Sequence, residues 1–177
     1  MALRSIDKYA KNLGKIWIYT EADLKDFQLV NVVKMGDPIK DNKDANLINK
    51  IRACADNPDV SENFMFWSDD QVLMQELDLE KAPVVYNRRD INTLKKTEKT
   101  KWRERLKHTL EYVKQHGNRA VYNYDAHTPQ PYRKSDVQYV FSQVPYTQKP
   151  GFCVNTIYYG MLNRPGDVPQ EEVKFTV

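Results

Sequence analysis

The chain has 177 residues, and its 27 lysines and arginines against 24 aspartates and glutamates give a formal net charge of +3. Hydrophobic residues make up 41% of the sequence and include 11 tyrosines, so we expect one compact domain over residues 1–177 and too little chain for two. This composition excludes a disordered chain. No apolar run reaches the roughly 20 residues that a membrane-spanning helix needs.

Two further features of the sequence bear on the compartment. Cys54 and Cys153 lie in apolar segments without metal-binding spacing, so we expect buried, reduced thiols. Residues 1–8 lack the continuous apolar stretch of a secretory signal. Together these features predict a cytoplasmic protein.

The first part of the chain alternates between helical and extended patterns. Apolar residues at helical spacing predict a helix over residues 2–13, and apolar runs predict buried strands at 15–20 and 28–33. A second apolar stripe predicts a helix over residues 45–56, which Pro58 ends.

The rest of the chain continues this alternation. Residues 63–67 are almost wholly apolar, which predicts a central strand covered on both faces, and residues 82–86 predict a strand nearer an edge. A long amphipathic helix is expected over residues 102–113, a strand at 120–124 and a helix around 156–162. Alternating strands and helices favour an α/β fold with helices on both faces of a sheet.

The apolar strand at 63–67 runs directly into Asp69 and Asp70, which is the most informative feature of the sequence. Ligands of open α/β sheets bind outside the carboxyl ends of the strands. Two adjacent carboxylates at such an edge repel each other unless a cation is near, and Mg²⁺ or Mn²⁺ prefers carboxylate oxygen. The pair is therefore a candidate metal site, and its alternative role is to cap the next turn.

His127 follows the predicted strand at 120–124, so it reaches the same sheet edge if the two strands run parallel. Its imidazole then completes the metal site of the two aspartates, acts as an acid or base, or satisfies a turn through a ring nitrogen. His108 and His116 fall on the basic helix and at its end, where solvation or C-terminal capping accounts for them.

Asn46 and Lys50 lie four residues apart and therefore share one helix face, offset from the apolar stripe. If this face looks toward the cleft, Lys50 neutralises a phosphate and Asn46 bonds a ribose or sugar hydroxyl. The alternative is an ordinary surface pair. The chain has no G-x-x-x-x-G-K-[ST] or G-x-G-x-x-G loop, which argues against an ATPase or a dinucleotide oxidoreductase.

Positive charge is concentrated between residues 94 and 119, where nine lysines and arginines accompany three glutamates. This face is either a solvated helix flank or a site for an anion or polyanion. A nucleic-acid-binding domain would use it with Trp102 as a stacking platform. Trp102 falls on the apolar stripe, however, and is expected in the core.

The candidate residues belong to four segments: KIWIY at 15–19, N-x-x-x-K-I at 46–51, FMFWSDD at 64–70 and YDAHTP at 124–129. In this order they resemble GT-A-type nucleotide-sugar transferases. The closest likeness is to phage and bacterial glycosyltransferase-like proteins and to the Stealth capsular polysaccharide phosphotransferases. The last segment is similar to the His-x-Pro segment that follows the acidic motif in those proteins.

The resemblance implies a Rossmann-like, GT-A-type mixed sheet flanked by helices. It places Asp69 and Asp70 in the acidic motif that binds the metal and the donor diphosphate, with Asp70 also catalytic. His127 is then a further metal ligand or a catalytic group, and Asn46 and Lys50 line the donor site.

The implied cofactor is Mn²⁺ or Mg²⁺, and the implied donor is a nucleotide sugar. The acceptor is a hydroxyl group of a polysaccharide, a lipid-linked molecule or another compound, and it attacks the anomeric carbon or the phosphorus. Lys50, with Arg88 or Arg89, would share the charge of the departing nucleoside phosphate.

Domains of this type begin with a strand and loop that hold the nucleotide base, whereas this sequence begins with the predicted helix at 2–13. We therefore expect a GT-A-like domain that lacks the usual first strand, as after N-terminal truncation. The alternative to a sugar or sugar-phosphate transferase is a non-catalytic relative that keeps the fold as a binding module.

Overall fold

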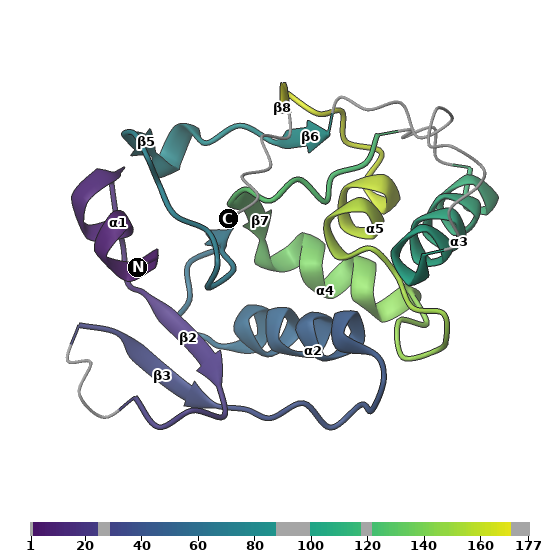
Figure 1. Cartoon of the computed structure of the whole chain (residues 1–177), viewed down its shortest axis with the longest axis horizontal. Helices are drawn as coiled ribbons and strands as arrows, with labels where there is room; N and C mark the ends of the chain where they lie inside the picture. Colours follow the sequence, from purple (N-terminus) through teal and green to yellow (C-terminus); the bar gives the residue numbers. More distant parts are fainter. Residues whose placement is uncertain (1, 25–28, 88–99, 118–121, 171–177) are drawn as a thin grey trace.

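A computed structural model describes residues 2–24, 29–87, 100–117 and 122–170 (Figure 1). Within these ranges the fold is α/β, as the sequence predicts, with five α-helices and eight short strands. The helices are α1 (Ala2–Tyr9), α2 (Lys43–Asp56), α3 (Lys101–Gln115), α4 (Lys134–Gln143) and α5 (Val154–Met161), with a 3-10 turn η1 (Leu79–Lys81). None of these described helices has the length and apolar content to cross a membrane.

The strands pair two by two. Parallel pairs join β1 (Ala10–Lys11) to β5 (Leu77–Asp78), β2 (Trp17–Thr20) to β3 (Asn31–Lys34), and β6 (Val85–Asn87) to β8 (Val168–Gln170). The remaining pair, β4 (Asn63–Phe66) and β7 (Gln130–Arg133), is antiparallel. The described residues thus form four two-stranded sheets, whereas the resemblance implies one mixed sheet.

Two predicted helices have different ends in the structure. α1 ends at Tyr9, earlier than predicted, because the next two residues pair with β5 and Asn12 has a positive φ of 57°. α2 begins two residues before its predicted start. The side chain of Asn42 accepts a hydrogen bond from the backbone N–H of Ala45 (Oδ1–N 3.1 Å), which caps the first turn.

The strand pattern differs from the prediction at β4 and near residue 124. β4 has β7 as its one strand partner among the described residues, so the expected central position is not observed. Of the strand predicted at 120–124, residues 120 and 121 lie outside the described ranges, and Asn123 forms an isolated antiparallel bridge with Asn87. Sequence patterns do not indicate β7, because it is short and contains Pro131.

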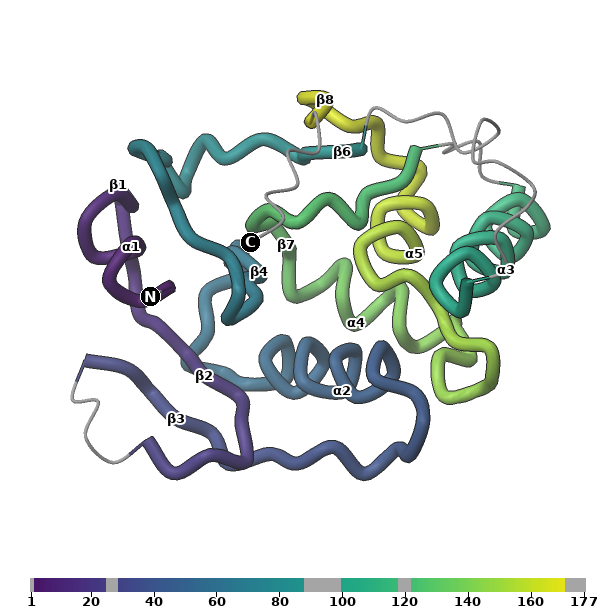
Figure 2. The backbone as a smooth tube through the Cα atoms, viewed as in Figure 1, coloured from purple at the N-terminus to yellow at the C-terminus, as the bar shows by residue number. Residues whose placement is uncertain are grey.

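The hydrophobic core lies among the helices. α4 packs against both α2 and α5, and α3 covers α5 (Figures 1 and 2). Fully buried side chains in this region include Ile48, Val140, Phe152 and Ile157. Most of the buried hydrophobic side chains belong to the helices.

Both cysteines are free thiols, as predicted. Cys153 is buried and Cys54 is half-buried, and burial raises the pKa of each thiol. A thiol held in its neutral form is a poor nucleophile and a poor metal ligand. The cysteines are therefore parts of the packing.

Four tyrosines form a cluster beside α5. The rings of Tyr132 and Tyr158 stack with centroids 4.0 Å apart, and the ring of Tyr159 lies 5.0 Å from that of Tyr124. All four side chains are buried. Burial raises the pKa of Tyr124 and of Tyr158 to about 12, and it also raises the pKa of Tyr132 and of Tyr159.

This cluster predicts alkaline unfolding. Between the unfolded pKa of about 10 and the raised folded values, the unfolded chain has lost the phenolic proton and the folded chain still holds it. These tyrosines therefore stabilise the fold fully below about pH 10. Between that pH and its raised folded pKa, each one lowers the free energy of unfolding by about 1.4 kcal/mol per pH unit. As the pH rises, we expect tyrosinate absorbance to increase over the same pH range in which helical circular dichroism is lost. The midpoint pH of this transition should be higher in Tyr158→Phe and unchanged in Tyr139→Phe, whose ring is exposed.

Candidate functional site

The antiparallel register of β4 and β7 decides where the predicted site residues lie. Phe66, at the end of β4, is paired with Gln130, at the start of β7. The chain that leaves β4 carries Asp69 and Asp70, and the chain that enters β7 carries His127. The acidic pair and the histidine therefore belong to segments that meet at one end of the same strand pair, which we call the acidic end.

The two aspartates occupy the middle of a closed turn. The backbone N–H of Gln71 donates to the carbonyl of Ser68 (3.2 Å), and the backbone N–H of Ser68 donates to the Gln71 side-chain oxygen (3.2 Å). The indole N–H of Trp67 donates to the Gln71 carbonyl (3.1 Å). Asp69 and Asp70 are exposed at this turn, and neither forms a hydrogen bond or ion pair with another described residue.

His127 lies at the apex of a second tight turn. The backbone N–H of Thr128 donates to the carbonyl of Ala126 at 2.7 Å, so the chain reverses around the histidine. Ala126 is buried, whereas His127 is exposed. The backbone thus presents the imidazole to the outside.

These residues do not form a closed metal cage. Among the residues that the structure describes, no group of three or more histidine, cysteine, aspartate or glutamate side chains is arranged to hold a metal ion. The pairing of β4 with β7 brings the segments that carry Asp69, Asp70 and His127 to the same end of the strand pair. Their side chains do not form one such metal-binding group among the described residues.

The polar groups of Asn46 and Lys50 bind the loop that precedes α2. The Asn46 amide accepts from the backbone N–H of Ile39 (2.9 Å) and donates to its carbonyl (2.8 Å), while the Lys50 ammonium pairs with Asp37 (2.7 Å). No hydrogen bond or ion pair joins either residue to the acidic end within the described ranges. The structure therefore gives both residues a local role in holding this loop.

The remaining charged candidates lie partly in α3 and partly outside the described residues. Arg88 and Arg89 lie outside the described residues, as do residues 94–99 and 118–119 of the basic stretch. In the described part of α3, Trp102 is half-buried, and Arg105 turns inward to pair with Asp44 at 2.6 Å.

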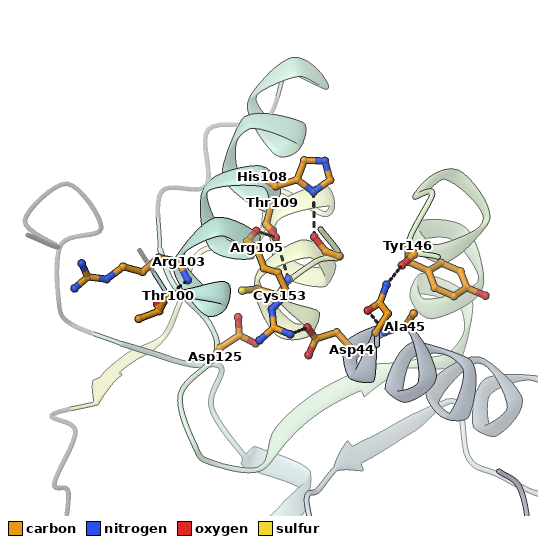
Figure 3. A network of polar contacts seen from close by, with 12 residues as sticks. Asp44, Ala45, Thr100, Arg103, Arg105, His108, Thr109, Asp125, Tyr146 and Cys153 are labelled. Carbon is orange, nitrogen blue, oxygen red and sulfur yellow. Dashed lines mark hydrogen bonds and ion pairs between the residues drawn. The ribbon is translucent and has the colours of Figure 1, made fainter. Parts of the chain in front are cut away.

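A polar cluster at the ends of α2, α3 and α5 was not indicated by the sequence. Figure 3 shows the Arg105 side chain pointing toward Asp44, with Asp125 and Cys153 nearby. Burial raises the pKa of Asp44, against the opposing effect of the Arg105 charge. Burial also raises the pKa of Asp125, against hydrogen bonds from Thr156 and Asn155.

This cluster is held by the α3 backbone as well as by charge. The Thr109 hydroxyl donates to the Arg105 carbonyl (2.7 Å) and accepts from the backbone N–H of Cys153 (2.9 Å). Next to it, His108 contacts the Gly151 carbonyl through Nδ1 at 3.0 Å (Figure 3). The only sequence signal for any of this is that Asp125 lies two residues before His127.

Comparison with known proteins gives no further assignment, because no family model, curated protein or solved structure matches the chain.

Proposed function

We propose that the chain is a transferase that depends on a divalent metal ion and moves a sugar or sugar phosphate from a nucleotide-sugar donor to a hydroxyl acceptor. The proposal assigns the GT-A-type site to the acidic end. The observation that carries it is the pairing of Phe66 with Gln130, because this register joins the acidic turn and the His127 turn at one end of one strand pair.

The chemistry of the acidic end suits a hard cation. Asp69 and Asp70 offer exposed carboxylate oxygens that no described residue neutralises, and Mn²⁺ or Mg²⁺ prefers such ligands. A bound ion would supply Lewis acidity toward the diphosphate of the donor. Asp69 and Asp70 would hold that ion, and the imidazole of His127 would be a further ligand or a base.

The reaction balances without any other reactant. The acceptor oxygen forms a bond to the anomeric carbon or to the phosphorus, the bond to the departing nucleoside phosphate breaks, and that group keeps the electron pair. The proton of the acceptor hydroxyl passes to a base, for which His127 is the exposed candidate at the acidic end.

Isothermal titration tests the proposal directly. A panel of UDP-sugars is titrated into the full chain with Mn²⁺ and again with the metal chelated. Heat of binding that requires Mn²⁺ is expected for at least one donor. Binding of a sugar without metal dependence, or no heat in either case, would overturn the transferase and favour the non-catalytic binding module.

A further inference from the structure

We propose that Asp125 is a positioning residue, which fixes the segment that carries His127 at the acidic end. The inference rests on the proposed function, because it assigns Asp125 to the site that His127 serves. Through Asp125, the helix α5 holds the imidazole in place.

The first observation is the attachment of Asp125 to the N-terminus of α5. One carboxylate oxygen accepts the backbone N–H of Asn155 (3.2 Å), and the other accepts the hydroxyl of Thr156 (2.9 Å). The free N–H groups and the positive dipole end of a helix favour a carboxylate at this place. Asp125 is therefore anchored to a buried helix by two bonds.

The second observation is that Thr156 also binds the backbone beside Asp125. Its hydroxyl accepts the backbone N–H of Tyr124 at 3.0 Å, and it lies 3.2 Å from the side-chain oxygen of Asn123. The same Asn123 oxygen accepts the backbone N–H of Asp125 at 3.0 Å. Residues 123–125 are thus held as a unit, with Thr156 as the shared contact.

The third observation is a second anchor on the other side of His127. Gln130 is fully buried, and its side-chain amide accepts from the backbone N–H of Val85 (3.2 Å) and donates to the Val85 carbonyl (2.8 Å). The chain from Asp125 to Gln130 is therefore an arch that is fixed at both ends.

The arch exposes one residue to solvent. Within residues 123–130 every residue is buried or half-buried except His127, which is exposed. The charged and titratable groups near Asp125 include Asp44 of α2, Arg105 of α3 and Cys153 before α5 (Figure 3), together with Tyr132 of β7. An arch with rigid ends and one exposed imidazole is suited to hold a metal ligand in a fixed place.

The test compares two matched threonine variants of the full chain. Thr156→Val removes the hydroxyl that binds Asp125 and Tyr124, whereas Thr109→Val makes the same change at another buried threonine that also contacts the start of α5. Thr156→Ser keeps the hydroxyl. A role in stability alone predicts similar behaviour in the two valine variants, and positioning predicts a selective effect of Thr156→Val.

Two measurements separate the outcomes. Mn²⁺ alone is added, and its affinity and the broadening of the His127 imidazole resonances are measured. Thr156→Val is expected to weaken Mn²⁺ binding by about 10- to 100-fold and to reduce the broadening, while Thr156→Ser and Thr109→Val stay near the unchanged protein. Equal Mn²⁺ affinity and broadening in all four proteins would overturn the inference.

The second measurement does not need metal. Hydrogen exchange of the Thr128 amide, which closes the His127 turn, is expected to become at least about tenfold faster in Thr156→Val and to stay unchanged in Thr109→Val. If the unchanged protein binds no Mn²⁺, the proposed function fails and this exchange rate alone decides the positioning role. Where Thr156→Val does not fold, Asp125→Asn replaces it in both measurements, and an unchanged rate there overturns the inference.

Discussion

Replacing Asp70 with asparagine is expected to weaken Mn²⁺-dependent binding of the donor by about 100-fold, which corresponds to about 2.7 kcal/mol. The substitution keeps the size of the side chain and removes one of the two negative charges that would hold the ion. Asp70 is exposed in a turn that is closed by Trp67 and Gln71, so the free energy of unfolding should change by no more than about 0.5 kcal/mol. Titration calorimetry and thermal melting measure the two quantities separately.

The control for this substitution lies at the opposite end of β4. Asp59→Asn makes the same chemical change at an exposed aspartate that precedes the strand, and it should leave donor binding unchanged. Asp69→Asn should behave like Asp70→Asn. A large fall in the melting temperature of either variant, with donor binding retained, would show that the acidic pair caps the turn and does not bind metal.

Gln130→Met is expected to destabilise the fold by about 2–4 kcal/mol. The Gln130 amide satisfies both backbone groups of Val85 from a fully buried position, and methionine of similar size leaves the N–H and the carbonyl without these partners. Each buried polar group that loses its hydrogen bond costs about 1–3 kcal/mol. Denaturant unfolding monitored by circular dichroism gives the value.

Two further variants show whether the hydrogen bonds are the cause. Gln115→Met changes an exposed glutamine of α3, and it should alter stability by less than about 0.5 kcal/mol. Gln130→Glu keeps an acceptor for the Val85 N–H but buries a charge at neutral pH, so its stability should recover as the pH is lowered and the carboxyl regains a proton. Equal stability of Gln130→Met and the unchanged protein would contradict the role of this amide.

The elements that follow from local patterns agree with the structure. The helix at 45–56 has a continuous apolar stripe and a capping asparagine before it, and it becomes α2 with little change. The strands predicted at 15–20 and 28–33 overlap β2 and β3, because short runs of β-branched and aromatic residues favour extended chain whatever they pair with. The predicted burial was wrong, since β2 is half-buried and β3 is mostly exposed on a two-stranded sheet. Local periodicity is sufficient in these places.

Pairing between distant segments was harder to predict. Nothing in the sequence near β4 identifies β7 as its partner, because Pro131 disfavours a strand and the partners are far apart in the chain. The acidic turn and the His127 turn lie at one end of the β4–β7 pair. The prediction of a shared sheet edge relied on a parallel strand at 120–124, whereas the structure uses antiparallel β7.

The candidate site was predictable only where the residue type and its neighbours in the sequence were themselves informative. Two adjacent aspartates after an apolar strand are visible in any reading of the sequence. The attachment of Asp125 to the N-terminus of α5 depends on Asn155 and Thr156, which come 30 and 31 residues later in the chain. The inward amide of Asn46 was missed for a similar reason, since its partner Ile39 belongs to a loop without a regular pattern.

The way the strands pair also bears on the order of folding. Ala10 pairs with Leu77, Phe66 with Gln130 and Val85 with Val168, so three of the four described strand pairs close loops of more than 60 residues. Closing such loops costs chain entropy before any contact compensates for it, and proteins dominated by such contacts fold slowly. The acidic end can form only after β7 has been synthesised and has paired with β4, so a nascent chain that stops before residue 127 would contain Asp69 and Asp70 and lack His127.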